Sequence, residues 1–227
     1  MKDSKIIISK SKYLYTYSVA DFHVCLTPVH YCLIADSSNS ISSELWAQLT
    51  SVIRSIATGI DIGPGAAESK VALIQYGRKV VRIFNLTDNL DKATVLDAIS
   101  SAQQLERTRP GGTSTPDAIL ECLKIFEEQS QTGVPKVIMV FSGGVTRYPR
   151  RSDAFEERRL QEAVNMSSAA GTTNYGVIFT GNDPERAQRE AVTIAQGAEE
   201  RAFYATTLAE LEMELIRDLA CGKNNSY

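Results

Sequence analysis

Short apolar runs alternate with longer amphipathic segments along this chain of 227 residues. The runs at residues 29–35, 136–141 and 174–179 are bounded by polar or turn residues, which predicts buried strands, and residues 201–205 predict a shorter strand. Residues 70–76 and 80–84 flank Gly77 and Arg78, and this pattern predicts a hairpin.

Between these strands, apolar residues recur at spacings of three and four. In the segment 42–58, Trp46, Leu49 and Val52 fall on one stripe of a predicted helix. At the segment 183–196, Asp183 followed by Pro184 has the composition of a helix N-cap and first helical position. Further helices are predicted over residues 91–102, 113–128, 153–169 and 207–220.

Strands that alternate with helices imply a mostly parallel sheet with helices on both faces. We therefore expect a doubly wound, three-layer α/β sandwich, in which the hairpin supplies one antiparallel edge strand. Residues 25–222 are predicted to form this one domain, with residues 1–24 as an N-terminal extension and residues 223–227 as a tail. Ligands of such sheets bind outside the carboxyl ends of the strands, so the loops there are the first to examine.

Three of these loops have a recognisable composition. The loop that begins at Asp36 reads D-S-S-N-S, a D-x-S-x-S pattern between a predicted strand and a predicted helix. A second loop reads G-G-T-S-T, with Thr113 at its centre, and a third reads S-G-G over residues 142–144, directly after a predicted strand.

Together the three loops resemble those of the von Willebrand factor A family, including integrin I domains, over about residues 28–220. The resemblance implies a metal-ion-dependent adhesion site that holds Mg²⁺ or Mn²⁺. Ser38 and Ser40 would then bind the cation directly, Thr113 directly or through water, and Asp36 from behind the first layer of ligands. Hydroxyl and carboxylate oxygens suit such hard cations.

The third loop departs from the family pattern. Gly143 stands where the family has an aspartate, so Asp36 is the one carboxylate that offsets the charge of the cation. We expect weaker metal binding as a result. The alternative is a degenerate site, in which Asp36 and the serines persist because they cap the following helix.

Composition and charge narrow the possible partners. The formal net charge is −3, which gives no bulk attraction to nucleic acid, and no apolar stretch is long enough to span a membrane. Five arginines lie close to the predicted site loops. They could contact a carboxylate-rich protein or a sulfated polysaccharide, or form an ordinary solvated face: Arg107, Arg109, Arg147, Arg150 and Arg151.

The chain has four cysteines, none of them in a C-x-x-C pair. Cys25 and Cys221 bracket the predicted domain, which suggests a disulfide between its ends, and free thiols are the alternative. Cys32 falls inside a predicted buried strand and is expected to pack there as a small apolar side chain.

No catalytic motif is present, and neither of the two histidines lies near the site loops, so we expect a binding protein rather than an enzyme. By the resemblance, and by the flanking cysteines, the expected function is extracellular adhesion or matrix binding to a protein ligand. The alternative is an intracellular scaffold domain of the same fold that binds its partners without metal.

Overall fold

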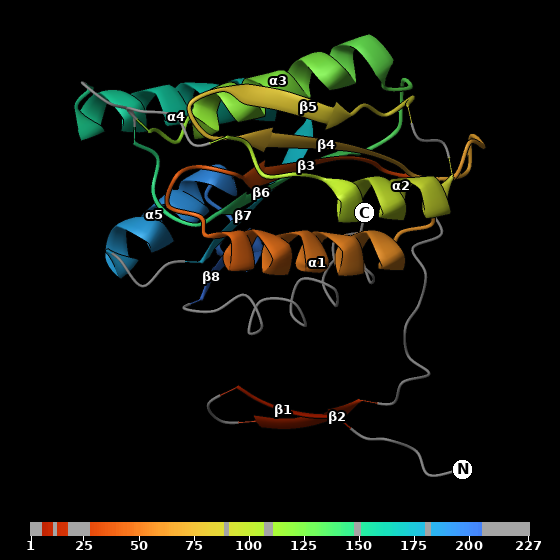
Figure 1. The fold of residues 1–227 in the computed structure, drawn as a ribbon, viewed down its shortest axis with the longest axis horizontal. Coiled ribbons are helices and arrows are strands. Elements are labelled where there is room, and N and C mark those ends of the chain that lie inside the picture. Colours follow the sequence, from red (N-terminus) through yellow and green to blue (C-terminus); the bar gives the residue numbers. More distant parts are fainter. Residues whose placement is uncertain are drawn as a thin grey trace.

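The computed structural model describes residues 6–10, 13–17, 28–88, 91–106, 111–147, 151–179 and 183–205 (Figure 1). Six strands form the main sheet: β3 His30–Asp36, β4 Lys70–Tyr76, β5 Val80–Phe84, β6 Lys136–Ser142, β7 Thr172–Phe179 and β8 Ala202–Ala205. The described helices are α1 Ser43–Gly59, α2 Lys92–Ser101, α3 Thr115–Gln129, α4 Asp153–Ala169, α5 Pro184–Ile194 and the short 3₁₀ helix η2 Glu199–Arg201.

The strand order across the sheet is β5-β4-β3-β6-β7-β8, and all neighbours are parallel except β4 and β5. The first strand of the sheet in the chain, β3, therefore lies in its interior, and the chain winds outward from it in both directions. This order confirms the predicted doubly wound α/β sandwich with one antiparallel edge strand. The direction of winding changes between β3 and β6, which is where such folds bind ligands.

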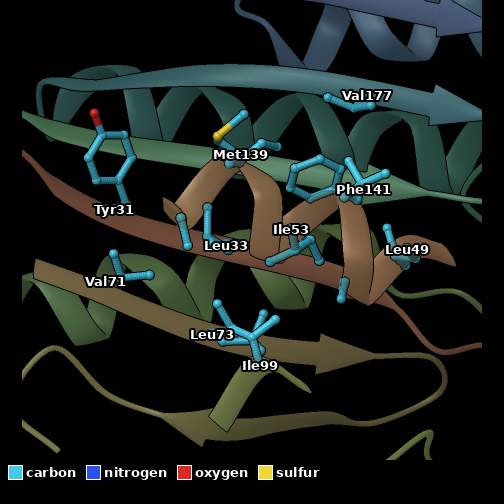
Figure 2. Packing of buried hydrophobic residues seen from close by; sticks show 14 of the residues in the cluster. Tyr31, Leu33, Leu49, Ile53, Val71, Leu73, Ile99, Met139, Phe141 and Val177 are labelled. Atoms are coloured by element: carbon cyan, nitrogen blue, oxygen red, sulfur yellow. The ribbon is translucent and has the colours of Figure 1, made fainter. Parts of the chain in front are cut away.

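Alternate side chains of β3 enter opposite faces of the sheet. Tyr31 and Leu33 pack with α1 and α2, as the close view in Figure 2 shows for Leu33, Leu49 and Ile53. Cys32 and Ile34 belong instead to the apolar layer under α3, α4 and α5. Because β3 is buried on both faces, its sequence is a continuous apolar run rather than an alternating one.

A disulfide joins Cys32 on β3 to Cys122 on α3, across 90 positions of sequence and with the two Cα atoms 5.9 Å apart. Both side chains are fully buried. Cys32 is buried among apolar side chains as expected, but it is not a free thiol, so the alternative of four free cysteines is wrong. Cys25 and Cys221, the pair predicted to be bonded, lie outside the described residues, so their disulfide stays a prediction.

Two elements begin at residues other than those predicted from the sequence. The predicted helix 113–128 begins at Thr115 instead, because the Thr113 amide donates to the Arg147 carbonyl at 2.7 Å in an isolated β-bridge. Strand β7 begins two residues earlier than predicted, at Thr172. The predicted helix 207–220 lies outside the described residues.

Two further strands, β1 Ile6–Lys10 and β2 Tyr13–Tyr17, pair antiparallel as a separate two-stranded sheet within the predicted N-terminal extension. The limits of that extension, of the domain and of the tail stay predictions. Among the helices in the described part of the chain, none has the length and apolar character needed to cross a bilayer.

Candidate functional site

The carboxylate of Asp36 organises the junction between two of the predicted site loops. Asp36 ends β3 and is fully buried. Its Oδ1 accepts a hydrogen bond from the Ser38 amide at 2.8 Å, and its Oδ2 accepts one from the Gly143 amide at 3.0 Å. The Ser142 hydroxyl also lies 3.1 Å from Oδ2. Asp36 thus ties the loop after β3 to the loop after β6.

Burial raises the pKa of Asp36, and the hydrogen bonds from Ser38, Gly143 and Ser142 partly offset that rise. A buried carboxylate costs free energy unless donors or an opposite charge compensate it. The donors around Asp36 are neutral, so a cation bound above the carboxylate would provide the positive charge that compensates its burial.

The two serines of the first loop lie side by side. The Oγ atoms of Ser38 and Ser40 are 2.9 Å apart. Two neighbouring ligands of an octahedral Mg²⁺, each about 2.1 Å from the ion, would be about 3.0 Å apart, so this spacing fits both a hydrogen bond and a shared cation. The hydroxyl geometry is therefore compatible with the predicted ligand role.

Helix capping does not explain these serines. The N-cap of α1 is Ser42, whose hydroxyl accepts a hydrogen bond from the Leu45 amide at 3.1 Å. Asp36 instead accepts from Ser38 inside its own turn. Since the capping function belongs to Ser42, the alternative that the motif persists as a helix cap loses its physical basis.

The second and third loops are joined to each other. Thr113 is 8% exposed, and its amide donates to the Arg147 carbonyl at 2.7 Å. Two residues on, the Thr115 hydroxyl lies 2.7 Å from that of Thr146. The position of Thr113 is therefore set by the end of the loop that begins at Ser142.

The end of the Ile41 side chain lies where a side chain at position 143 would begin. A Cβ atom at this position would lie 2.2 Å from Cδ1 of Ile41 and 3.3 Å from Cε2 of Phe179. The end of the isoleucine side chain thus occupies the space into which an aspartate would project. Among the described residues, no group of three or more histidine, cysteine, aspartate or glutamate side chains could hold a metal ion. Hydroxyls would have to provide most of the ligands.

These loops enclose an open pocket of about 680 Å³ at the carboxyl edge of the sheet. Ser38, Ser40 and Thr113 all line it, as do the glycines of the second and third loops. The structure therefore brings together the three hydroxyl residues predicted to bind the cation, although Ser38 and Thr113 lie 75 positions apart in the sequence.

The predicted arginine patch is only partly within the described residues. Arg147 and Arg151 line the pocket and are exposed. Arg151 lies 3.2 Å from Glu156 and 5.4 Å from the centre of the Phe155 ring, so part of its charge is already engaged. Arg107, Arg109 and Arg150 lie outside the described residues.

Two acidic residues of the pocket were missed in the sequence. Asp153, at the start of α4, and Asp183, the N-cap of α5, line it beside the arginines. Asp183 follows β7, so its place at the carboxyl edge of a strand could have identified it. Asp153 pairs with Arg186 at 2.6 Å. The pocket wall is therefore of mixed charge rather than basic.

Comparisons with known proteins agree with the fold. A sequence model of the von Willebrand factor type A domain matches residues 32–218. Human integrin alpha-11 is 27% identical over 192 residues, which is 81% of this chain but only 15% of that protein. The chain thus spans a small part of this relative's length.

Two solved structures share the fold at low sequence identity. Proximal thread matrix protein 1 from the mussel byssus, with a zinc-occupied MIDAS motif, has a TM-score of 0.69 and 15% identity, covering 86% of this chain and 46% of that one. Manganese-loaded TRAP protein from Plasmodium vivax has a TM-score of 0.63 and 16% identity, covering 87% and 75%.

Proposed function

The chain belongs to the von Willebrand factor type A domain family, and we propose that it is a binding module that engages a protein ligand at the carboxyl edge of its sheet through a divalent cation. The observation that carries this proposal is the placement of Ser38, Ser40 and Thr113 around one pocket, above the buried carboxylate of Asp36. Hydroxyl side chains, glycines and charges of both signs line the pocket, and such a surface suits binding rather than catalysis.

Mg²⁺ or Mn²⁺ is the cation that we propose. Ser38 and Ser40 would bind it directly, Thr113 directly or through water, and Asp36 would orient the serine loop from behind. When bound, the cation offers a coordination position to a carboxylate of the partner protein. Because Gly143 brings no charge, the site would attract such a carboxylate strongly while holding the cation weakly.

An extracellular or cell-surface location forms part of the proposal. The Cys32–Cys122 disulfide supports it, because disulfides persist in oxidising compartments and are rare in the cytosol. The similarity to an integrin, and the fold shared with a matrix protein of the mussel byssus, point the same way. The alternative, a metal-independent intracellular scaffold, requires reduced cysteines at these two positions.

A protein ligand is better supported than a sulfated polysaccharide. A polysaccharide site needs an uncompensated basic surface, whereas Arg147 and Arg151 share the pocket with Asp153 and Asp183. A single ligand carboxylate at a cation needs no such surface. Polysaccharide binding therefore stays a prediction without specific support among the described residues.

Calorimetric titration of Mg²⁺ and Mn²⁺ into EDTA-treated protein tests the proposal. We expect binding at micromolar to millimolar cation, and at least a tenfold loss in the Ser38→Ala variant because a direct ligand is removed. Ser43→Ala is the matched control, since Ser43 is exposed at the start of α1 and does not line the pocket. Equal binding by all three proteins, or none by the parent, would refute the cation mechanism.

A further inference from the structure

A buried acid lies behind the third site loop. Glu190, on α5, is 6% exposed. The Thr146 amide donates to both of its carboxyl oxygens at 2.9 Å, and the Thr146 hydroxyl lies 2.6 Å from Oε1. Acidic side chains are almost never this buried unless they are paired.

Among the described residues, Arg186 is the cation that lowers the pKa of Glu190, but the hydrogen bonds of its guanidinium go to other groups. Arg186, one turn earlier on α5, directs its guanidinium to Asp153 at 2.6 Å and to the Thr146 carbonyl at 3.4 Å. Thr146, which is neutral, is thus the main hydrogen-bond partner of the Glu190 carboxyl. The pKa of Glu190 is raised to about 7, chiefly by burial. The hydrogen bonds from Thr146 and the charge of Arg186 offset part of this rise, and the charge of Asp36 adds to it.

Thr146 connects this acid to the candidate ligand Thr113. The hydroxyl of Thr146 lies 2.7 Å from that of Thr115, and the next residue, Arg147, accepts the Thr113 amide at 2.7 Å. The loop 142–147 is therefore fixed at its start by Asp36, through the Gly143 amide, and at its end by Glu190.

The protonation state of Glu190 sets the direction of hydrogen bonding at Thr146. A neutral carboxyl can accept from the Thr146 amide and donate to the Thr146 hydroxyl, which then donates to Thr115. An ionised carboxyl can only accept. Ionisation also places a charge in a site shielded from water, and this favours any opening of the loop that hydrates Glu190.

Solvent has a route to this group. Helix α5 packs beside α4 and against β7, and a pocket of about 210 Å³ between the two helices is lined by Glu190. The charged residues Glu157, Arg186 and Arg189 line the same pocket. On the sheet side, the titratable groups that interact with Glu190 are those of Asp36 and Tyr76.

We propose that Glu190 is a positioning residue of the candidate site: its neutral form tethers the loop 142–147 through Thr146, and its ionised form releases that loop and, with it, Thr113. The consequence for ligand binding rests on the function proposed above. The tether itself needs no bound cation.

Amide hydrogen exchange, followed by NMR on the metal-free protein and corrected for intrinsic exchange, tests this. Between about pH 6 and pH 8, the Thr146 and Thr113 amides should lose about tenfold in protection, since ionisation with a pKa near 7 favours the hydrated form. Glu190→Gln mimics the neutral acid and should abolish this pH dependence. Glu185→Gln, an exposed change on the same helix, should retain it.

Parallel pH profiles in the parent and Glu190→Gln would overturn the proposal. So would a pH dependence confined to the Thr146 amide, because the link to Thr113 would then be absent. Mn²⁺ titration of the same proteins separates the two proposals. If none binds Mn²⁺ while the exchange result holds, the cation function fails and the tether stands.

Discussion

Replacing Glu190 with glutamine should make the protein more stable at alkaline pH, although the change removes a native carboxylate. In the folded protein, burial raises the pKa of Glu190 from an ordinary 4.5 to about 7. The folded state therefore binds the proton more tightly than the unfolded state does. The stability that this provides is fully present below about pH 4.5 and is lost as the pH rises through about 7.

The size of the expected difference in unfolding free energy follows from the rise in the pKa of Glu190 on folding. A difference of about 2.5 pKa units corresponds to about 3 kcal/mol, at about 1.4 kcal/mol per unit. Glutamine has nearly the same shape as the neutral acid and can make the same contacts with Thr146, so it does not lose this free energy as the pH rises. The buried carboxyl of Asp36 also titrates, but it is common to both proteins and largely cancels in the difference.

Urea unfolding of the parent and Glu190→Gln at several pH values measures this directly. We expect similar unfolding free energies at about pH 5, and an advantage of about 3 kcal/mol for the variant at about pH 8. For a domain of this size, that advantage corresponds to a melting temperature about 6–12 °C higher.

Two curves that stay parallel across this range would refute the reasoning. A variant that is least stable at high pH would show instead that hydrogen bonds from Thr146 and the charge of Arg186 outweigh the cost of burial. Glu185→Gln serves as the control, because its carboxylate is exposed and its removal should leave the pH profile of the parent unchanged.

Two further changes test other parts of the structure. Replacing Cys32 and Cys122 together by alanine should lower the unfolding free energy by about 4–5 kcal/mol, because the disulfide closes a long loop; an unchanged urea midpoint would show that the bond is absent or contributes nothing. Gly143→Asp should raise Mn²⁺ affinity at least tenfold in calorimetry, since it restores a carboxylate and the flexible end of Ile41 can move aside; no gain would mean that this space stays closed.

Much of the fold could be predicted because its signals are local. Apolar runs and helical spacing identified the six strands of the main sheet and helices α1 to α5, with differences of one or two residues at most ends, whereas β1, β2 and η2 were not predicted. The predicted start of α3 was wrong because Thr113 forms a β-bridge with Arg147, 34 positions further along the chain, and therefore does not join the helix.

The candidate ligands could be predicted because Asp36, Ser38, Ser40 and Thr113 lie in loops whose composition and order are visible in the chain. The Cys32–Cys122 disulfide was missed because no local pattern reveals which strand face meets which helix. The two residues meet because α3 packs on the face of β3 to which Cys32 points.

By itself, then, the sequence determined the class of fold, the edge of the sheet at which the candidate site lies and the oxygen atoms available there, since these follow from periodicity and from short motifs. Only the tertiary structure decided that Ile41 fills the place of the missing carboxylate, that Asp153 and Asp183 line the pocket beside the arginines, and that Glu190 lies beneath the third loop. The physical reason is that burial and charge pairing depend on which residues meet when α4 and α5 pack against the sheet. Glu190 cannot be recognised from the sequence because its partner, Thr146, lies 44 positions earlier and contacts it only in the folded protein.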